Sequence, residues 1–297
     1  MAQKLLHYDV LERIGEGARS TIYAVRDPTT GKTYALKHVL RADDKDLRFI
    51  QQVENEFQIS KQFHHPSLRR SLQLKINKTL LLRKHEIFLV MELVDGTPLD
   101  VRCPPDLQEI DDTIIKAAQG LRYMHGLGLV HCDIKPNNIL RSEDGQVKVI
   151  DFGQSCKIGT IKERIQGTPD YIAPEQVSRR PVTQQTDVFN LGATLYWALT
   201  GRHIPTLYTV NRQGENSFLL DARIDTPQDL NPKVPPALSN LVMDSISTAM
   251  RKRPPDMDAF LTRLELGKHI LLKNVPPPPA DGNSSRTRTN RKEKEEV

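Results

Sequence analysis

Residues 131–140 read His131-Cys132-Asp133-Ile134-Lys135-Pro136-Asn137-Asn138-Ile139-Leu140, and Asp151-Phe152-Gly153 follows directly after the apolar run 147–150. Taken alone, the pattern Asp-x-Lys-Pro-x-x-Asn predicts a polar turn. A plain turn does not explain a second acidic motif at this separation. The two motifs together therefore indicate a functional site.

A glycine-containing segment, residues 14–22, lies upstream between two predicted strands. Glycine permits a tight turn whose backbone N–H groups approach anionic oxygens closely. These residues alone favour a plain hairpin. In the phosphate-binding pattern Gly-x-Gly-x-x-Gly, Ser20 occupies the position of the third glycine. The following strand ends at Lys37, where an ammonium group that closes an apolar strand requires a partner. A lysine at such a position is otherwise a surface residue.

A carboxylate partner for this lysine is expected on the next helix. Residues 49, 53, 57 and 60 recur at helical intervals and predict an apolar face. Glu56 lies on this face, whereas Glu54 falls on a different one. An inward carboxylate needs a cation, so we expect Lys37 and Glu56 to pair.

From about Tyr8 to Leu266 the chain resembles the eukaryotic-like protein kinase superfamily in its serine/threonine branch, and residues 133–138 look more like bacterial members than animal ones. The resemblance implies transfer of the γ-phosphate of ATP, with Mg²⁺, to serine or threonine hydroxyls of protein substrates. Asp133 would accept or orient the hydroxyl proton, and Lys135 would lie near the transferred phosphate. The implied metal ligands are Asn138 and Asp151, whose amide and carboxylate oxygens suit a hard cation.

Residues 167–175 resemble the end of an activation segment, in which Thr168 would tie Asp133 to Lys135. The implied catalytic residues are Asp133, Lys135 and Thr168. Glu175 would form a structural ion pair with Arg253. Asp187 would anchor the catalytic loop from the start of its helix.

By the same resemblance, ATP would bind between the glycine-containing hairpin and the connector that follows residue 90. Met91 would limit the back pocket, and the backbone of Glu92 and Val94 would read the adenine edge. Ala35 and Leu140 would lie on either side of the ring, and Lys37 would contact the α- and β-phosphates. The implied nucleotide-binding residues are Ile14, Gly15, Gly17, Ile22, Ala35, Lys37, Glu56, Met91, Glu92, Val94 and Leu140.

The order of the expected elements, with the resemblance, predicts an α+β, bilobal protein kinase fold over residues 8–272. A small antiparallel-β lobe with one key helix would occupy residues 8–94, and a larger, mainly helical lobe residues 95–272. Residues 273–297 are Pro-rich and charged and predict a disordered tail. Strands are expected at 8–14, 20–26, 33–39, 71–76 and 87–93, and helices at 49–60, 110–126, 187–199, 238–250 and 257–266.

The composition of the chain indicates its cellular compartment and which binding partners to expect. Three cysteines without metal-ligand spacing favour a reducing, cytoplasmic compartment, and no apolar run reaches the ~18 residues of a membrane span. The net charge of +5 comes partly from two basic runs, residues 69–84 and 286–292. We interpret both as solvated surfaces and expect no nucleic-acid binding, because neither run interleaves aromatic residues for base stacking.

Two other functions use related folds. A pseudokinase typically lacks the equivalents of Lys37, Asp133 or Asp151, and all three are present. A small-molecule phosphotransferase is disfavoured by Thr168 with residues 173–175, since that segment serves peptide substrates.

Cys132 departs from the resemblance with a consequence for control. Many relatives place an arginine there, which grips a phosphate on the activation segment. A cysteine offers neither a positive charge nor a fork of donors. We therefore expect basal activity without phosphorylation of this segment, on which Ser155 and Thr160 are the candidate phosphosites.

Overall fold

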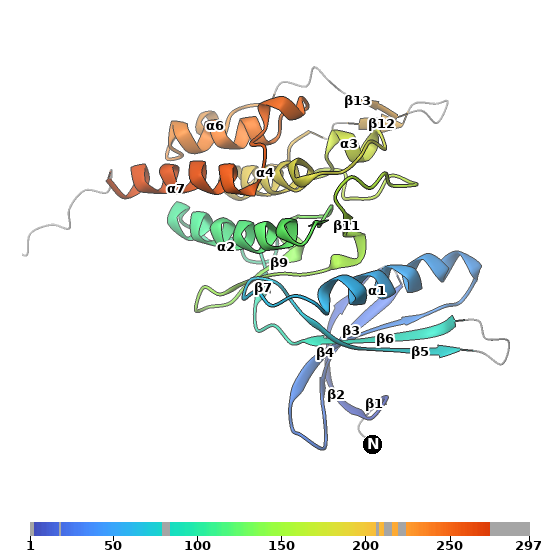
Figure 1. Cartoon of the computed structure of the whole chain (residues 1–297). Helices are drawn as coiled ribbons and strands as arrows, with labels where there is room; N and C mark the ends of the chain where they lie inside the picture. Colours follow the sequence, from blue (N-terminus) through green and yellow to red (C-terminus); the bar gives the residue numbers. More distant parts are fainter. Residues whose placement is uncertain are drawn as a thin grey trace, which may run out of the picture.

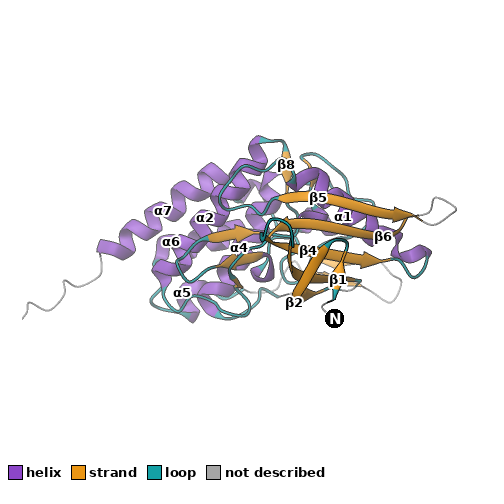
Figure 2. Cartoon of the chain, turned by 90° about the horizontal axis from the view of Figure 1, so that it is seen from below, coloured by secondary structure: helices purple, strands orange, loops and turns teal. Residues whose placement is uncertain are grey.

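The computed structural model describes residues 3–17, 19–78, 84–205, 208–210, 216–218 and 224–273. A curled sheet with one helix forms one end of the molecule, and a stack of helices forms the other (Figure 1). Seen from below, the strands of the sheet lie on one side of the molecule together with α1, and most of the helices lie on the other (Figure 2). This is the predicted α+β, bilobal arrangement.

The smaller lobe is built on a six-stranded antiparallel sheet in the order β1-β2-β3-β4-β6-β5. Its strands are β1 Lys4–Leu5, β2 Tyr8–Glu16, β3 Ser20–Arg26, β4 Thr33–Leu40, β5 Ser71–Lys78 and β6 Lys84–Glu92. Alternate residues of the central strands serve two apolar clusters on opposite faces, as the two-residue period of a strand requires. On β4, Ala35 and Val39 belong to one cluster and Leu36 to the other.

The helix of the small lobe, α1, runs from Leu47 to Ser60 and follows the short 3-10 turn η1, Asp44–Asp46. Ile50 and Val53 pack onto the face of the sheet that carries Val39. The apolar stripe recognised in the sequence is thus the packing face of α1, and Glu56 lies on it with 1% exposure.

The larger lobe has one core to which α2, α4, α6 and α7 all contribute, and in Figure 1 α4 and α7 lie between α2 and α6. Its helices are α2 Leu107–Gly126, α3 Pro174–Val177, α4 Gln184–Thr200, α5 Pro227–Leu230, α6 Pro236–Ser245 and α7 Met257–Lys273. Side chains cap the two long central helices: Asp106 accepts from Glu109 N at 2.8 Å, and Thr183 begins α4 with a capping box. Gly201 ends α4 in the left-handed conformation, with φ of +68°.

Short strands and 3-10 turns shape the loops of the larger lobe. The strands are β7 Thr97–Pro98, β8 Leu129–Val130, β9 Ile139–Arg141, β10 Val147–Val149, β11 Cys156–Lys157, β12 Tyr208–Val210 and β13 Asn216–Phe218. The 3-10 turns are η2 Pro136–Asn138, η3 Phe152–Gln154 and η4 Met250–Lys252. β9 lies between β7 and β10 in a three-stranded sheet, and β9 and β10 form a hairpin. The residues just before β9 and just after β10 are therefore held side by side.

Several element bounds differ from the predicted ones. Helix α6 ends at Ser245 and not at the predicted end, Met250, because Ile246, Ser247 and Thr248 are poor helix formers. Helix α7 continues to Lys273, seven residues beyond the expected end. Strand β6 begins at Lys84 because its ladder with β5 continues past the apolar run. β1 pairs with β2 ahead of the predicted start of the domain.

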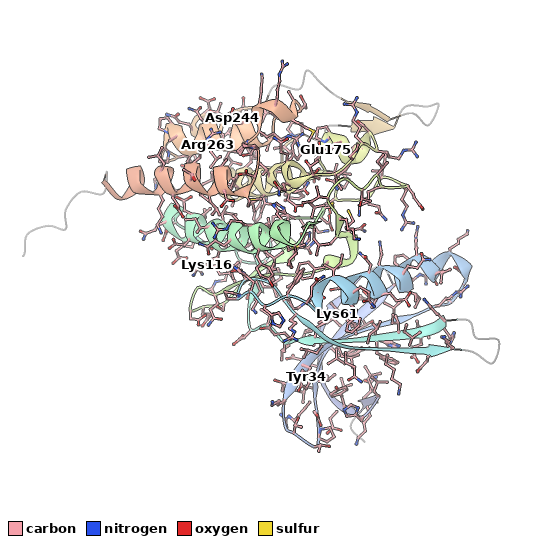
Figure 3. The ribbon with its side chains drawn as sticks, in the orientation of Figure 1. Tyr34, Lys61, Lys116, Glu175, Asp244 and Arg263 are labelled. Carbon is pink, nitrogen blue, oxygen red and sulfur yellow. The ribbon has the colours of Figure 1, made fainter. Side chains whose placement is uncertain are left out.

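Helix α7 is joined to α6 by an ion pair between Arg263 and Asp244 at 2.7 Å (Figure 3). Apart from Lys273, the predicted tail lies outside the described residues. In the part of the chain that the structure describes, no helix is both long enough and apolar enough to cross a membrane.

Candidate active site

The catalytic loop lies between β8 and β9 and is held by Asp187 in the first turn of α4. This carboxylate is fully buried and accepts hydrogen bonds from the backbone N of His131 at 2.9 Å and of Cys132 at 2.8 Å, and it contacts His125 Nε2 at 2.8 Å. Burial acts to raise the pKa of Asp187, but the hydrogen bond from His125 and the neighbouring histidines hold it below its usual range. An ionised Asp187 thus fixes Cys132, with φ of +66°, in the left-handed region. The predicted anchor is confirmed.

Asp133, Lys135 and Thr168 form one hydrogen-bonded group. Lys135 Nζ lies 3.1 Å from Asp133 Oδ2 and donates to Thr168 Oγ1 at 2.8 Å, while Thr168 Oγ1 donates to Asp133 Oδ1 at 3.2 Å. Gly167, with φ of +137°, supplies the backbone conformation that brings Thr168 to this position. Burial raises the pKa of Asp133, and the charge on Lys135 opposes this effect. Such a carboxylate can accept a hydrogen bond from an incoming hydroxyl.

Asn138 and Asp151 are brought together by the β9–β10 hairpin. The backbone N of Ile150 donates to Asn138 O at 2.9 Å, one residue before Asp151. Asn138 Nδ2 donates to Asp133 O at 2.8 Å, which leaves its amide oxygen as the atom available to a cation. The charge on Lys37 lowers the pKa of Asp151 to about 2, against burial. An ionised carboxylate and an amide oxygen, carried by two backbone segments that are hydrogen-bonded to each other, match the ligand chemistry of Mg²⁺.

Lys37 links the small lobe to Asp151. Its Nζ lies 2.7 Å from Glu56 Oε2 and 3.4 Å from Asp151 Oδ1. Burial would lower the pKa of Lys37, but the Asp151 and Glu56 carboxylates outweigh it and raise the pKa above its ordinary value. The predicted pair with Glu56 is therefore present, and the alternative partner Glu54 pairs with Lys84 instead.

Arg69 is the residue of this site that the sequence did not predict. It was assigned to a solvated basic run, and this assignment is wrong: its side chain is 7% exposed and its Nη2 donates to Glu56 Oε1 at 3.1 Å. Its neighbour Arg70 is exposed. Arg69 lies in an irregular segment between α1 and β5, where no periodic pattern separates an inward side chain from an outward one.

The glycine-containing hairpin joins β2 to β3. Gly17 N donates to Ser20 O at 2.7 Å and closes the turn, while Ala18 lies outside the described residues. Arg19, which the sequence also left unassigned, pairs with Asp46 at 3.1 Å just ahead of α1. Of the implied nucleotide contacts in this hairpin, Ile14 is 46% exposed and Ile22 is half-buried opposite Gly15.

The connector begins at the end of β6. Met91 is fully buried next to Ala35 of β4. Glu92 N already donates to Arg70 O at 3.0 Å, so Glu92 can offer a ligand only its backbone carbonyl. Leu140 approaches from the other lobe on β9, and Val94 follows in the connector.

The activation segment, which follows Asp151, is tied down at both ends. At its far end Arg253 forms a two-point ion pair with Glu175, at 2.9 Å and 3.1 Å, which confirms the predicted pair; Glu175 is labelled in Figure 3. At its near end Ser155 is 1% exposed, and its hydroxyl lies 3.3 Å from His131 O. Ser155 is thus not an accessible phosphosite in this arrangement, contrary to expectation, because it faces the catalytic loop.

Cys132 occupies an apolar niche formed with Val130, Val182 and Cys156. Its Sγ lies 3.9 Å from Cys156 Sγ. These contacts explain how a small, uncharged side chain is accommodated next to Asp133, where an arginine was usual by resemblance.

A cavity of about 210 Å³ lies between the hairpin of the small lobe and the catalytic residues, and its lining includes Gly17, Arg19, Lys37, Asp133 and Asp151. A larger hollow of about 660 Å³ borders the connector from Glu92 to Thr97 and the β9–β10 hairpin. The smaller cavity places Lys37 and Arg19 beside Asp133 and Asp151, which is the chemistry that a phosphate chain with a divalent cation requires.

The chain is similar to several named kinases. It is 28% identical over 284 residues to the serine/threonine-protein kinase PAK mbt of Drosophila melanogaster, an alignment covering 91% of this chain and 40% of that protein. It is also 28% identical over 284 residues to the serine/threonine-protein kinase PknA of Mycobacterium tuberculosis, covering 92% of this chain and 64% of that protein. The chain thus spans less than two thirds of the length of these relatives.

The family model for the protein kinase domain matches residues 8–261, most of the chain. The same residues contain strands β2 to β6, helices α1 to α6 and every residue that lines the smaller cavity. This chain therefore belongs to the protein kinase family.

Proposed function

We propose that this protein is an active serine/threonine protein kinase that transfers the γ-phosphate of ATP, with Mg²⁺, to hydroxyls of protein substrates. The observation that carries the proposal is the group formed by Asp133, Lys135 and Thr168, with hydrogen bonds of 2.8 Å and 3.2 Å to the threonine hydroxyl. Within this group, Asp133 lines the same cavity as Lys37 and Asp151. The serine/threonine preference is supported by the names of the relatives.

The residues of the chain have distinct parts in this proposal. Asp133 accepts the hydrogen bond of the substrate hydroxyl and orients its oxygen toward the phosphate, while Lys135 offsets negative charge that develops there. Lys37 binds the phosphates of ATP from the small lobe, and Glu56 keeps its ammonium group in place. On the other side, the glycine hairpin around Gly17 lets the backbone approach the phosphates closely.

Asn138 and Asp151 would hold Mg²⁺, and their oxygens fit it, since Asp151 is ionised and the Asn138 amide is fixed by its bond to Asp133 O. When bound, the cation neutralises phosphate charge. For the nucleotide base we propose a site between Ala35 and Leu140, bounded by Met91 and by the connector carbonyl of Glu92 and backbone of Val94, with Ile14, Gly15 and Ile22 covering it.

We further propose residues 8–272 as the catalytic domain, with lobes at 8–94 and 95–272. A cytoplasmic location is supported by three free thiols, Cys103, Cys132 and Cys156, which a reducing compartment preserves.

The activity is tested by incubating the purified chain with γ-labelled ATP and a generic basic protein, with Mg²⁺ and with a chelator. We expect labelled phosphoserine or phosphothreonine that depends on Mg²⁺. A folded chain that binds ATP but labels no protein would identify a pseudokinase, and labelling of a small molecule alone would identify the other phosphotransferase class.

A further inference from the structure

Glu56 carries two cations on one buried carboxylate. Its side chain is 1% exposed; Oε2 lies 2.7 Å from Lys37 Nζ, and Oε1 lies 3.1 Å from Arg69 Nη2. A carboxylate at this depth is strongly destabilised unless it is neutralised and hydrogen-bonded. One cation would be enough to balance the single negative charge of Glu56, so the presence of a second cation needs an explanation.

The backbone of Arg69 belongs to the other side of the site. Its N donates to Val149 O at 3.0 Å, and the preceding Leu68 bridges to the same residue of β10. Two residues beyond Val149 the chain reaches Asp151. Arg69 therefore connects α1, through Glu56, to the strand that carries the proposed metal ligand, by a route that does not pass through Lys37.

The two cations have different duties once ATP is bound. Lys37 already lies between Glu56 and Asp151, and in the complex with ATP it would also face the phosphates. Its charge is then shared among several anions, so its interaction with Glu56 becomes weaker. Arg69 has no such competing task. Its guanidinium is always charged and presents a rigid fork of donors, so it can keep Glu56 neutralised and fixed while Lys37 is shared.

A second contact fixes the same turn of α1. Asn55 Nδ2 donates to Gly153 O at 3.2 Å and to Ser155 O at 2.8 Å. Neighbouring residues of α1 thus bind the segment after Asp151 and the strand before it. Neither contact involves a phosphorylated residue.

We propose that Arg69 is a positioning residue of the phosphotransfer site: it fixes Glu56, and through it Lys37 and α1, in the arrangement that binds ATP phosphates, without a phosphate on the activation segment. This inference rests on the proposed kinase function. It also gives a cause for the basal activity expected from Cys132, because the contacts of Arg69 and Asn55 fix α1 without a phosphate group on the activation segment.

The primary test compares Arg69→Met with Arg70→Met, a matched loss of charge at the exposed neighbour. We expect kcat/KM for ATP to fall about tenfold or more in Arg69→Met, with the KM for a peptide substrate within twofold of the parent. Arg70→Met should stay within twofold in both constants. Arg69→Lys should recover part of the loss, since it restores the charge without the fork.

A purely structural role is separated by a double-mutant cycle. If Arg69 acts through Glu56, Arg69→Met should cost less than twofold when added to Glu56→Gln, although it costs tenfold in the parent. Equal losses in both backgrounds, or an Arg69→Met enzyme as active as Arg70→Met, would overturn the proposal. Thermal unfolding of each variant identifies any that fails to fold.

Hydrogen exchange of the α1 amides measures the coupling between Arg69 and Glu56 independently of catalytic activity. Arg69→Met should speed exchange over residues 47–60, Arg70→Met should not, and adding Arg69→Met to Glu56→Gln should give no further increase. An inactive parent with this exchange pattern would refute the kinase function and retain the Arg69–Glu56 coupling. An active parent whose α1 exchange is unchanged by Arg69→Met would refute the inference alone.

Discussion

Asp151 keeps its charge because of one neighbour. The Lys37 ammonium, 3.4 Å away, lowers the pKa of Asp151 to about 2 although burial acts in the other direction. The carboxylate is therefore ionised at neutral pH, and its replacement removes a full charge there. We expect Asp151→Asn to lower phosphotransfer at least ~10²-fold while the melting temperature stays near that of the parent, as measured with γ-labelled ATP and by thermal unfolding.

Asp144→Asn is a suitable control for this change, because Asp144 is an exposed aspartate in the turn between β9 and β10. It should leave turnover unchanged. A folded Asp151→Asn enzyme with near-normal turnover would remove Asp151 from the proposed metal site.

At the same scale, the contrast between Glu56 and Arg69 shows what a sequence reveals about a site. Glu56 could be predicted because it interrupts a helical stripe whose period is known in advance. Arg69 and Ser155 could not, since both lie in irregular segments where the direction of a side chain depends on contacts with distant strands and loops. Ser155 in particular is buried by the catalytic loop, which lies more than twenty residues away in the sequence.

Helix α2 contains a charge that opposes folding. Asp111 is fully buried, and neither of its carboxylate oxygens has a hydrogen-bond partner among the described residues. Burial raises the pKa of Asp111 to about 7, although Lys268 acts to lower it. The unfolded chain ionises this group near pH 4 and the folded chain only near pH 7, so stability should fall as pH rises between these values and then level off.

Asp111→Asn should therefore raise the melting temperature at pH 8, by a change in unfolding free energy of the order of a few kcal/mol, and the gain should vanish near pH 4. Thermal unfolding from pH 4 to 8.5 measures this. Asp112→Asn is the matched control; it loses an ion pair with Lys268 and should show no such gain. A parent enzyme whose melting temperature does not decline between pH 5 and 7 would contradict the prediction.

The activation segment is the other element whose behaviour can be predicted. Ser155 is buried, Cys132 offers no grip for a phosphate, and Thr160 is the remaining candidate phosphosite of the two. Thr160→Ala should therefore keep peptide phosphorylation within a few-fold of the parent, with mass spectrometry confirming that the segment is unmodified. A hundredfold loss, restored by phosphorylating the parent segment, would show that another residue has taken the place of the missing arginine.

For the whole molecule, the motifs around Asp133 and Asp151 were enough to predict two lobes, since their order along the chain fixes which elements precede and follow the site. The limits of individual elements were less accessible. Helix α6 stops early at Ile246, and α7 continues past Leu266 because Gly267 lies against Leu238 of α6 and Lys268 pairs with Asp112 of α2. Such tertiary contacts are not visible in the local pattern.

The end of α7 sets the expected limit of the catalytic unit. Phe260 and Leu264 are fully buried and join α7 to the core formed by α2, α4 and α6. Residues after Lys273 are Pro-rich and charged and have no apolar face to add to this core. A chain truncated after Lys273 should therefore keep kcat/KM for a peptide within twofold of the parent and melt within a few degrees of it. Truncation after Asp256, which removes α7, is the contrasting control and should abolish cooperative unfolding, because it exposes the apolar surface that Phe260 and Leu264 cover. Loss of activity after the first truncation, with folding retained, would assign the residues beyond 273 a direct part in catalysis or substrate binding.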